Sequence, residues 1–511
     1  MLDIGTLFLL GIAYLLALFA IAFSTDRGWI PDKVVSHPFT YVLSLGVYIS
    51  AWCFYGITQV ADAQGYEYLT YFFGLSGFFM FGRLILLPMQ RICQDFQLAS
   101  LADLLSFRFR SQWAGILVTL FLSLSMLPLF AAQIKAVTIS AQLLTQPEQI
   151  SATDSGAALG LAFIFCLAIG WFTIAYGARQ VSYRQRHDGL VAAIAFETAV
   201  KTAVFLIIGA ASISGIFGSF EGMHRWLDAN PELIASYSYP AHQDGRTLLL
   251  LSFAAALGMP HVFHMVFSEK PSQQALRAST WGVPLLLLVF SLPVFPIVWG
   301  AIAAEPDATQ VFHTLAIGQI LNSPTLSALA YIGGLSAASG LMIVSTLAMA
   351  SMYLNHLILP FYKPSANRDI YVWLVWIRRI LIATIVLSSY LFYHLYAAGN
   401  QLFELGICAF AAILQFLPGV LALLFVPTIN RQGFLAGITG GIFTWFILLF
   451  LPMMTKSSLP LPSFSEQQLS ASDGWTIAVM WSFAINVLLM FVVSLYCKTS
   501  EEEKSVAALC A

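Results

Sequence analysis

Five ionisable side chains lie within strongly apolar stretches of the sequence, where charge is costly and usually serves a function. Lys135 lies within AAQIKAVTIS, and Glu197 and Lys201 are four residues apart in AIAFETAVKTAV. That spacing places both side chains on one helix face, so Glu197 and Lys201 are expected to pair. His261 and His264 are three residues apart and therefore also share one side of a helix. The lysines and histidines are candidate carriers of protons, and Lys135 could also balance the charge of a bound carboxylate.

Residues 331–346, YIGGLSAASGLMIVST, place small and hydroxyl-bearing side chains in the middle of another apolar stretch. Small residues allow two membrane helices to approach closely. Hydroxyl and carbonyl oxygens could instead replace the water around a cation, as hard cations require. Both interpretations are open at this point.

Two apolar segments contain residues that interrupt a helix. SLGVYISAWCFYGITQVADAQG has Gly46, Ser50 and Gly56 in its middle, and LSFAAALGMPHVFHMVFSEK has Gly258 and Pro260 near its centre. Proline removes a helical hydrogen bond, and a neighbouring glycine lets the chain bend. Interrupted helices at matching positions in two halves are typical of inverted-repeat transporters with a site at the membrane midplane. A simple proline kink is the alternative.

Membrane spans must position these groups, because the 511-residue chain is 59% hydrophobic and only 9% charged, whereas a soluble domain carries about 25% charged residues. A span needs about 20 apolar residues. Thirteen spans are expected, at approximately 4–24, 38–61, 68–91, 113–144, 157–177, 187–217, 246–268, 279–304, 323–359, 373–398, 401–427, 432–453 and 473–497. The ninth is too long for one straight span, so part of it is expected to be tilted or extramembrane. The connection 218–245 is expected to carry a short helix.

Lysine and arginine residues are distributed unevenly between the two sets of connections. With the N-terminus outside, the cytoplasmic connections contain Arg27, Lys33, Arg91, Arg108, Arg110, Arg179, Arg184, Arg186, Lys270, Arg277, Lys363, Arg368, Arg431, Lys498 and Lys504. The outer connections contain only Arg225, Arg246 and Lys456. The positive-inside rule therefore predicts an outside N-terminus and a cytoplasmic C-terminus.

No motif in the sequence indicates an enzyme: there is no Walker loop, no GxSxG and no HExxH. The six cysteines have neither CxxC nor Cys/His spacing, so neither a disulfide framework nor a zinc or other transition-metal site is predicted. A net charge of -2 without a basic tail predicts no nucleic-acid partner. No cofactor is expected, and Na⁺ and H⁺ are the candidate coupling ions.

Over nearly its full length the chain resembles the solute:sodium symporter family. The resemblance is carried by SLADLLSFRFRS (100–111), SLGVYISAWCFYG (44–56), the stretch 331–346 and ELGICAFAAILQFLPGVLALLF (404–425). It implies an all-α membrane protein with a LeuT-type fold, in which two inverted five-helix repeats occupy about 38–217 and 246–427. One additional helix would precede the repeats and two would follow, so that residues 1–497 form the transmembrane domain.

A narrower resemblance lies in YRQRHDGLVAAIAFETAVK (183–201) and MPHVFHMVFSEKPSQQALRASTWGVPL (259–285). These segments look like the transporter-like module that opens a class of bacterial sensor histidine kinases responding to histidine or acetate. The resemblance implies a bacterial inner membrane, a cytoplasmic kinase module in cis and a response regulator downstream. The tail 498–511 is similar to the start of the linker to such a signalling domain.

The wider resemblance implies a cation site between the first and the eighth core helix. The family's three carbonyl ligands and two hydroxyl ligands align with Gly46, Ile49, Gly333, Ser336 and Ala337. Ala337 has no hydroxyl, and two aspartates of the family align with Tyr48 and Gln185. A sodium site with fewer oxygens is weaker, so sodium coupling, proton coupling and no coupling are alternatives.

A substrate is expected between the two broken helices, near the midplane. The candidate binding residues are Ser50, Trp52, Gln133, Lys135, His261 and His264. A buried ammonium needs a counter-charge, which a substrate carboxylate would supply to Lys135; an internal pair with Glu197 or another acid is the alternative. Free N–H groups at broken helix ends also favour anions. A small carboxylate or amino acid is therefore predicted, with acetate first and histidine or another amino acid second, because the narrower resemblance is nearer the acetate-responsive branch.

Three functions fit these observations. The first is a membrane sensor whose transporter fold binds a small carboxylate, with or without transporting it, and reports to a cytoplasmic histidine kinase. The second is a stand-alone cation-coupled secondary transporter. The third is a receptor that binds without transport. In each case membrane lipid surrounds the protein.

Overall fold

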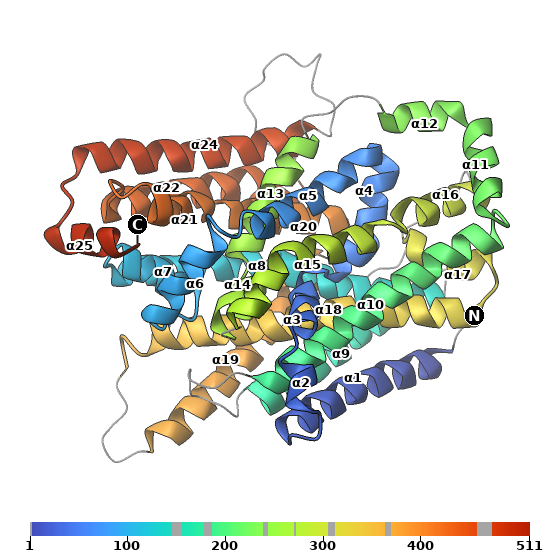
Figure 1. Cartoon of the computed structure of the whole chain (residues 1–511), viewed down its shortest axis with the longest axis horizontal. Helices are drawn as coiled ribbons and strands as arrows, with labels where there is room; N and C mark the ends of the chain where they lie inside the picture. The colour runs from blue at the N-terminus through green and yellow to red at the C-terminus, as the bar shows by residue number, and fades with distance from the viewer. Residues whose placement is uncertain are drawn as a thin grey trace.

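The computed structural model describes residues 3–510 except 146–155, 178–186, 239–243, 270–271, 305–311, 363–368, 398 and 457–472, and these residues form helices and connections without β-strands. Most of the helices run along the long axis of the molecule (Figure 1). Seven of the predicted positions, Arg179, Arg184, Gln185, Arg186, Lys270, Lys363 and Arg368, lie outside the described residues.

Ten helices of the described chain are long and apolar enough to cross a membrane, and two bent helix pairs raise the number to twelve. The long helices are α1 (Ile4–Asp26), α8 (Gln112–Thr145), α9 (Gly156–Gly177), α10 (Asp188–Gly215), α15 with α16 (Gln273–Ser291, Val294–Ala304), α18 with η6 (Pro324–Tyr353, Leu354–Ile358), α19 with η7 (Ile370–Phe392, Tyr393–Ala397), α20 with α21 (Leu402–Leu414, Leu417–Phe425), α22 with η8 and α23 (Arg431–Trp445, Phe446–Phe450, Leu451–Thr455) and α24 (Asp473–Tyr496). The prediction of a many-spanning all-α membrane protein is confirmed.

One expected span is divided. Residues 68–91 form α5 (Tyr68–Met80) and α6 (Leu86–Asp95), joined by a turn at 81–85 that contains Gly82 and Arg83. Arg83 lines a cavity of about 990 Å³ together with Arg91 and Arg277. A guanidinium group is costly in hydrocarbon, so Arg83 favours a turn here over a continuous apolar span.

Both predicted helix breaks are present. The first separates α3 (Pro38–Leu45) and η1 (Gly46–Tyr48) from η2 (Trp52–Gly56) and α4 (Ile57–Gln64); the bend between Pro38–Tyr48 and the helical stretch Trp52–Met80 is 73°. The second separates α13 (Asp244–Gly258) from α14 (Pro260–Phe263) and η5 (His264–Ser268), with a bend of 48°. Met259 is extended, with φ −68° and ψ 133°, because the proline that follows it disfavours helical backbone. The broken halves therefore begin and end where the sequence predicts.

Helix α18 lies at the centre of the bundle. It contacts α8, α10, α14 and both pieces of the first broken helix, η1 and η2. Its most apolar window is 94% buried, whereas that of α1 is 22% buried. Together α18 and η6 form one continuous helix of 35 residues, longer than one straight span needs, as the ninth predicted segment was.

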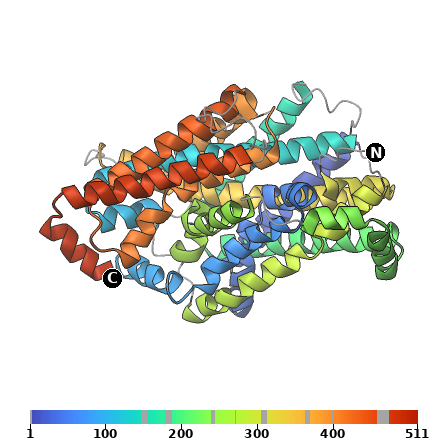
Figure 2. The ribbon, with the colours of Figure 1, turned by 90° about the horizontal axis from the view of Figure 1, so that it is seen from above.

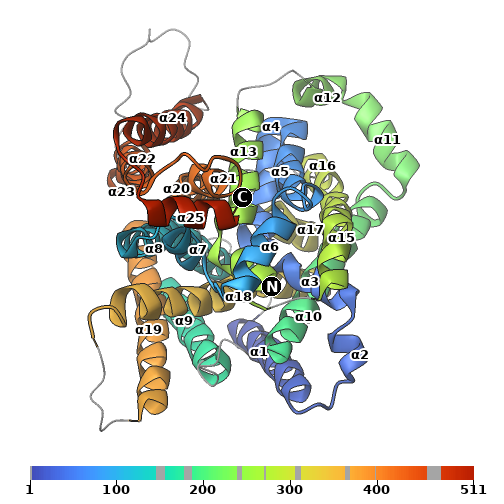
Figure 3. The ribbon, with the colours of Figure 1, turned by 60° about the vertical axis from the view of Figure 1, so that its left-hand side comes forward.

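The two ends of the molecule carry different short helices. The connection 218–245 contains two helices, α11 (Phe220–Ala229) and α12 (Pro231–Ser238), where one was expected. They lie at the end of the long axis where α1 begins, and the C-terminus lies at the other end (Figures 1 and 2). There the tail forms α25 (Glu501–Cys510), which contacts α7 (Leu101–Arg108) and α21 (Figure 3).

Candidate functional site

The break in the first broken helix is held by Gln133 of α8. Its Oε1 accepts a hydrogen bond from the Ala51 N–H at 2.9 Å, and its Nε2 donates to the Leu129 carbonyl at 3.0 Å. Ser50 lies in the break itself, where its carbonyl accepts from the Phe54 N–H at 2.8 Å. Gln133 and Ser50 are thus beside the predicted midplane site, and Gln133 supports the backbone there.

Trp52 begins the second half of this helix and is fully buried among aromatic rings. Its ring centroid lies 5.0 Å from that of Tyr71 on α5 and 4.9 Å from that of Phe410 on α20. Gly406 of α20 allows this approach, because a Cβ there would lie 2.0 Å from Trp52 Nε1. Trp52 therefore joins the first broken helix to α20.

His261 faces the same region from the second broken helix. Its Nδ1 lies 2.9 Å from Ser345 Oγ on α18, and its ring centroid lies 6.2 Å from that of Tyr48 on η1. Nε2 of His261 is buried and has no hydrogen-bond partner among the described residues. The structure therefore brings Trp52 and His261, two of the predicted residues, together with Tyr48 and Tyr71 between the broken helices.

Lys135 contacts backbone carbonyls beyond the end of α19. Its Nζ donates to the Asn400 carbonyl and to the Ala397 carbonyl, the latter at 3.4 Å. The lysine that pairs with Glu197 is Lys201, with Nζ 3.2 Å from Oε1. Lys135 is thus bound to carbonyls at the end of η7, and the expected pairing of Glu197 with Lys201 is confirmed.

The Glu197–Lys201 pair lies against the predicted cation positions. Both side chains are fully buried, and a Cβ on Gly340 of α18 would lie 2.2 Å from the Glu197 carboxylate. Ser336 Oγ donates to the Glu197 carbonyl at 3.0 Å. Lys201 also interacts electrostatically with His261. A buried ion pair therefore lies against the α18 positions that were predicted to hold a cation.

The predicted cation residues lie on or next to two elements in contact: Gly46 is in η1 and Ile49 directly follows it, whereas the other three are in α18. Gly46 packs on Thr198, and Gly333 packs on Phe54 and Val204, so closely that an added Cβ would clash. Ser339 Oγ donates to the Ser336 carbonyl at 3.1 Å. Close packing therefore explains the glycines of the stretch 331–346, and the Ser336 hydroxyl is already bonded to α10.

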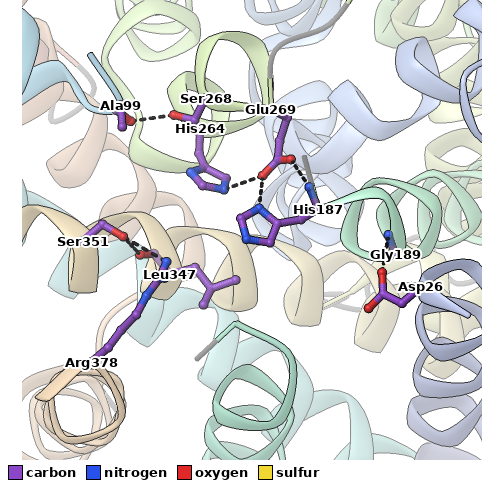
Figure 4. A network of polar contacts seen from close by, with 10 residues as sticks. All are labelled: Asp26, Ala99, His187, Gly189, His264, Ser268, Glu269, Leu347, Ser351 and Arg378. Atoms are coloured by element: carbon purple, nitrogen blue, oxygen red, sulfur yellow. Dashed lines mark hydrogen bonds and ion pairs between the residues drawn. The ribbon is translucent and has the colours of Figure 1, made fainter. Parts of the chain in front are cut away.

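His264 belongs to a second cluster (Figure 4). Its Nε2 lies 2.9 Å from Glu269 Oε1, and His187 Nδ1 lies 2.9 Å from the same oxygen. Glu269 follows the end of the second broken helix. Although burial alone would raise it, the hydrogen bonds from His187 and His264 hold the pKa of the Glu269 carboxyl well below its usual range. His261 and His264 were both predicted to bind the substrate, but they belong to different clusters.

The sequence prediction missed three members of these sites: Tyr71, His187 and Glu269. Tyr71 is one aromatic residue among many in YLTYFFGLSGFF, and nothing distinguishes it locally. His187 and Glu269 are 82 residues apart. His187 stands just before α10, a position typical of a helix boundary, and its partner became visible only through the fold.

Comparisons with known proteins show the fold. The chain matches the structure of a Na⁺-coupled sialic acid symporter, described in a substrate-bound outward-open state, with a TM-score of 0.67 and 13% identity over 98% of this chain and 100% of that chain. It also matches the manganese transporter of Eremococcus coleocola, with a TM-score of 0.52 and 14% identity over 93% of this chain and 96% of that chain. No protein-family profile and no curated protein sequence matches the chain. This is a multi-pass membrane protein with a LeuT-like transporter fold.

Proposed function

We propose that this chain binds a small carboxylate between its two broken helices and passes the resulting movement to a cytoplasmic histidine kinase that follows in cis. The observation that carries the proposal is the buried, unpartnered Nε2 of His261, which lies on one broken helix and near Tyr48 of the other. An unpaired buried polar atom is costly, and a ligand atom would satisfy it.

The surroundings of His261 favour an anion with a small apolar part. When Ser345 Oγ donates to Nδ1, the ring proton is on Nε2 and points away from α18 as a donor. The ammonium of Lys201 adds a positive field. Tyr48 beside His261 contacts Tyr71, which continues into the aromatic surface of Trp52 and Phe410. Acetate fits this combination best, with histidine or another amino acid second.

A series of side-chain and helix contacts connects this site to the C-terminal tail. The α20–α21 span contacts Trp52 through Phe410 at one end and α25 at the other. Glu503 anchors α25, because its Oε1 accepts from the Arg431 N–H at 2.9 Å and its Oε2 from the Ser500 N–H at 3.0 Å. A shift of Trp52 on ligand binding would therefore move a helix that touches the docked tail.

In this proposal the protein lies in a bacterial inner membrane with its N-terminus outside, and its kinase addresses a response regulator. These residues bind a ligand and catalyse no reaction. A stand-alone cation-coupled transporter is the second candidate, favoured by the similarity to transporters over nearly the whole chain. A receptor without transport is the third, favoured by the Glu197–Lys201 pair, because Lys201 already neutralises the carboxylate that lies against α18 at the cation positions.

His261→Phe should weaken acetate binding by about tenfold or more, since a hydrogen bond to a charged group contributes about 1.5–3 kcal/mol. Binding of labelled acetate and labelled histidine to the protein in lipid nanodiscs measures this. His224→Phe, on the exposed side of α11, is the matched control and should bind like wild type. Equal affinity in His261→Phe, or no binding of either ligand to wild type, would remove the proposed site.

Uptake measurements and the gene sequence distinguish the three candidate functions. Accumulation of label in proteoliposomes under an imposed sodium or proton gradient would favour transport, and binding without accumulation would favour the receptor. A reading frame that continues past Ala511 into a kinase supports the sensor, whereas a stop codon there favours the stand-alone alternatives.

Glu503→Gln should loosen the docked tail, because a carboxylate that accepts two backbone N–H bonds becomes a neutral amide. Hydrogen exchange in 501–510, followed by mass spectrometry, should become faster. The matched control is Glu501→Gln, whose side chain is exposed and contacts Lys504 at the surface. Unchanged protection in Glu503→Gln would show that α25 docks without this contact.

A further inference from the structure

Three side chains that commonly bind transition metals meet where α10 begins and the second broken helix ends. They are His187, His264 and Glu269, and their nearest ligand atoms all lie within 4.8 Å of one another. Figure 4 shows the Glu269 carboxylate between the two imidazole rings. The Glu269 side chain is 2% exposed, that of His264 is 10% exposed and that of His187 is 22% exposed. The cluster is therefore built into the protein but open to solvent on the His187 side.

We propose that His187 Nδ1, His264 Nε2 and Glu269 Oε1 form a binding site for a divalent transition-metal ion, with Zn²⁺ as the best fit. Two imidazoles and one carboxylate are the donor set of many zinc sites that hold water as a fourth ligand. The ion would take the place of the two ring protons that now bridge to Oε1 in the absence of metal. Imidazole donors favour zinc, cobalt, nickel or copper over magnesium and calcium.

The distances suit such an ion. Ligands about 2.0–2.2 Å from a tetrahedral zinc lie about 3.3–3.6 Å apart. Both histidine nitrogens lie 2.9 Å from Oε1, so each of these two separations would grow by roughly 0.4–0.7 Å. All three ligand atoms lie within 4.8 Å of one another, so small side-chain movements would bring them to these distances. The His187 N–H donates to Glu269 Oε2 at 2.8 Å and already orients the carboxylate, as supporting groups do at metal sites.

The neighbouring charges are compatible with a cation. Asp26 lies near His187 and accepts from the Gly189 N–H at 3.1 Å. Among the described residues a nearby cation is Arg378, whose Nη2 donates to Ser351 Oγ at 3.1 Å and is thus directed at α18. Among the described residues, the Glu269 carboxylate within the cluster and the Asp26 carboxylate beside it would both attract a cation.

A bound ion would tie the last helix of the first repeat to the first helix of the second. Ser268 Oγ already donates to the Ala99 carbonyl at 2.6 Å from the same end of η5. Metal would add a bond between elements that separate when one repeat moves against the other. The site would therefore hold this end of the molecule closed.

Cobalt and zinc binding to the full chain in detergent tests the site. The protein is purified without a polyhistidine tag, which would bind the same ions. We expect one Co²⁺ per chain with the visible spectrum of tetrahedral cobalt, displaced by Zn²⁺. His264→Gln and Glu269→Gln should each weaken binding by more than about tenfold, since even groups that only orient a ligand contribute about 10–100-fold. His224→Gln, at an exposed histidine, is the matched control.

X-ray absorption of the wild-type zinc complex provides a test that needs no variant. A zinc shell with two imidazoles supports the site, whichever variants fold. Absence of stoichiometric binding, a shell without imidazole, or equal affinity in wild type and His264→Gln would overturn it. These results do not depend on acetate binding, so the carboxylate site and the metal site can fail separately.

Discussion

Lys201→Met is expected to cost about 3–5 kcal/mol of stability, because it leaves the Glu197 carboxylate as an unpaired charge in the membrane interior. Both members of the pair are fully buried, with Nζ 3.2 Å from Oε1. The carboxylate lies against Gly340, which leaves little room for water to enter and solvate it. Unfolding of the purified protein by SDS, followed by tryptophan fluorescence, measures the loss.

The double variant Glu197→Gln/Lys201→Met distinguishes the effect of an unpaired buried charge from the effect of a changed side-chain shape. Replacing both members of a buried pair is often neutral or stabilising, so the double variant should regain most of the stability lost by Lys201→Met. Lys504→Met is the matched control, because Lys504 pairs with Glu501 at the surface and should matter little. If Lys201→Met unfolds like wild type, then the pair is not ionised in the folded protein.

Gly46→Ala is expected to destabilise the protein by about 1–3 kcal/mol through overpacking and to weaken ligand binding as well. A Cβ at Gly46 would lie 2.1 Å from Thr198 Cγ2, far inside van der Waals contact. Thr198 is buried on α10, so η1 must move away from α10. That movement displaces Tyr48 and the break that follows it. SDS unfolding and acetate binding measure the two effects.

Gly160→Ala is the matched control, since a Cβ on this glycine of α9 meets nothing within 4 Å. Alanine is also the better helix former, so this variant should be neutral or slightly more stable. Adding Thr198→Ala to Gly46→Ala removes the nearest methyl and should restore part of the stability. A Gly46→Ala protein that unfolds and binds like wild type would mean that η1 does not pack on α10 as described.

The features predictable from sequence are those fixed within one turn or one segment. Pro260 lacks an N–H and restricts the residue before it, so the second break could be predicted from two adjacent residues. The Glu197–Lys201 pair follows from a spacing of four on one helix. The sequence predicted one continuous span across 81–85, because the apolar composition continues through these residues. That Arg83 shares a cavity with two other arginines became apparent only in the structure.

The contacts of the candidate sites depend on the tertiary structure. Lys135 was predicted to balance a substrate carboxylate or to pair with an acid, and its Nζ also donates to the Asn400 carbonyl, a contact that no spacing in the sequence indicates. His187 and Glu269 are 82 residues apart, beyond any spacing rule for metal ligands. The transition-metal site was therefore not expected, although each of its residues is an ordinary ligand.

The buried position of α18 has an evolutionary consequence. Its most apolar window is 94% buried, and its glycines have no room for a larger side chain against Phe54, Tyr55 and Glu197. The most apolar windows of α1 and α19 are each 22% buried. Substitutions accepted during descent should therefore collect in those two outer helices, while α18 should change slowly even in relatives whose ligand is different.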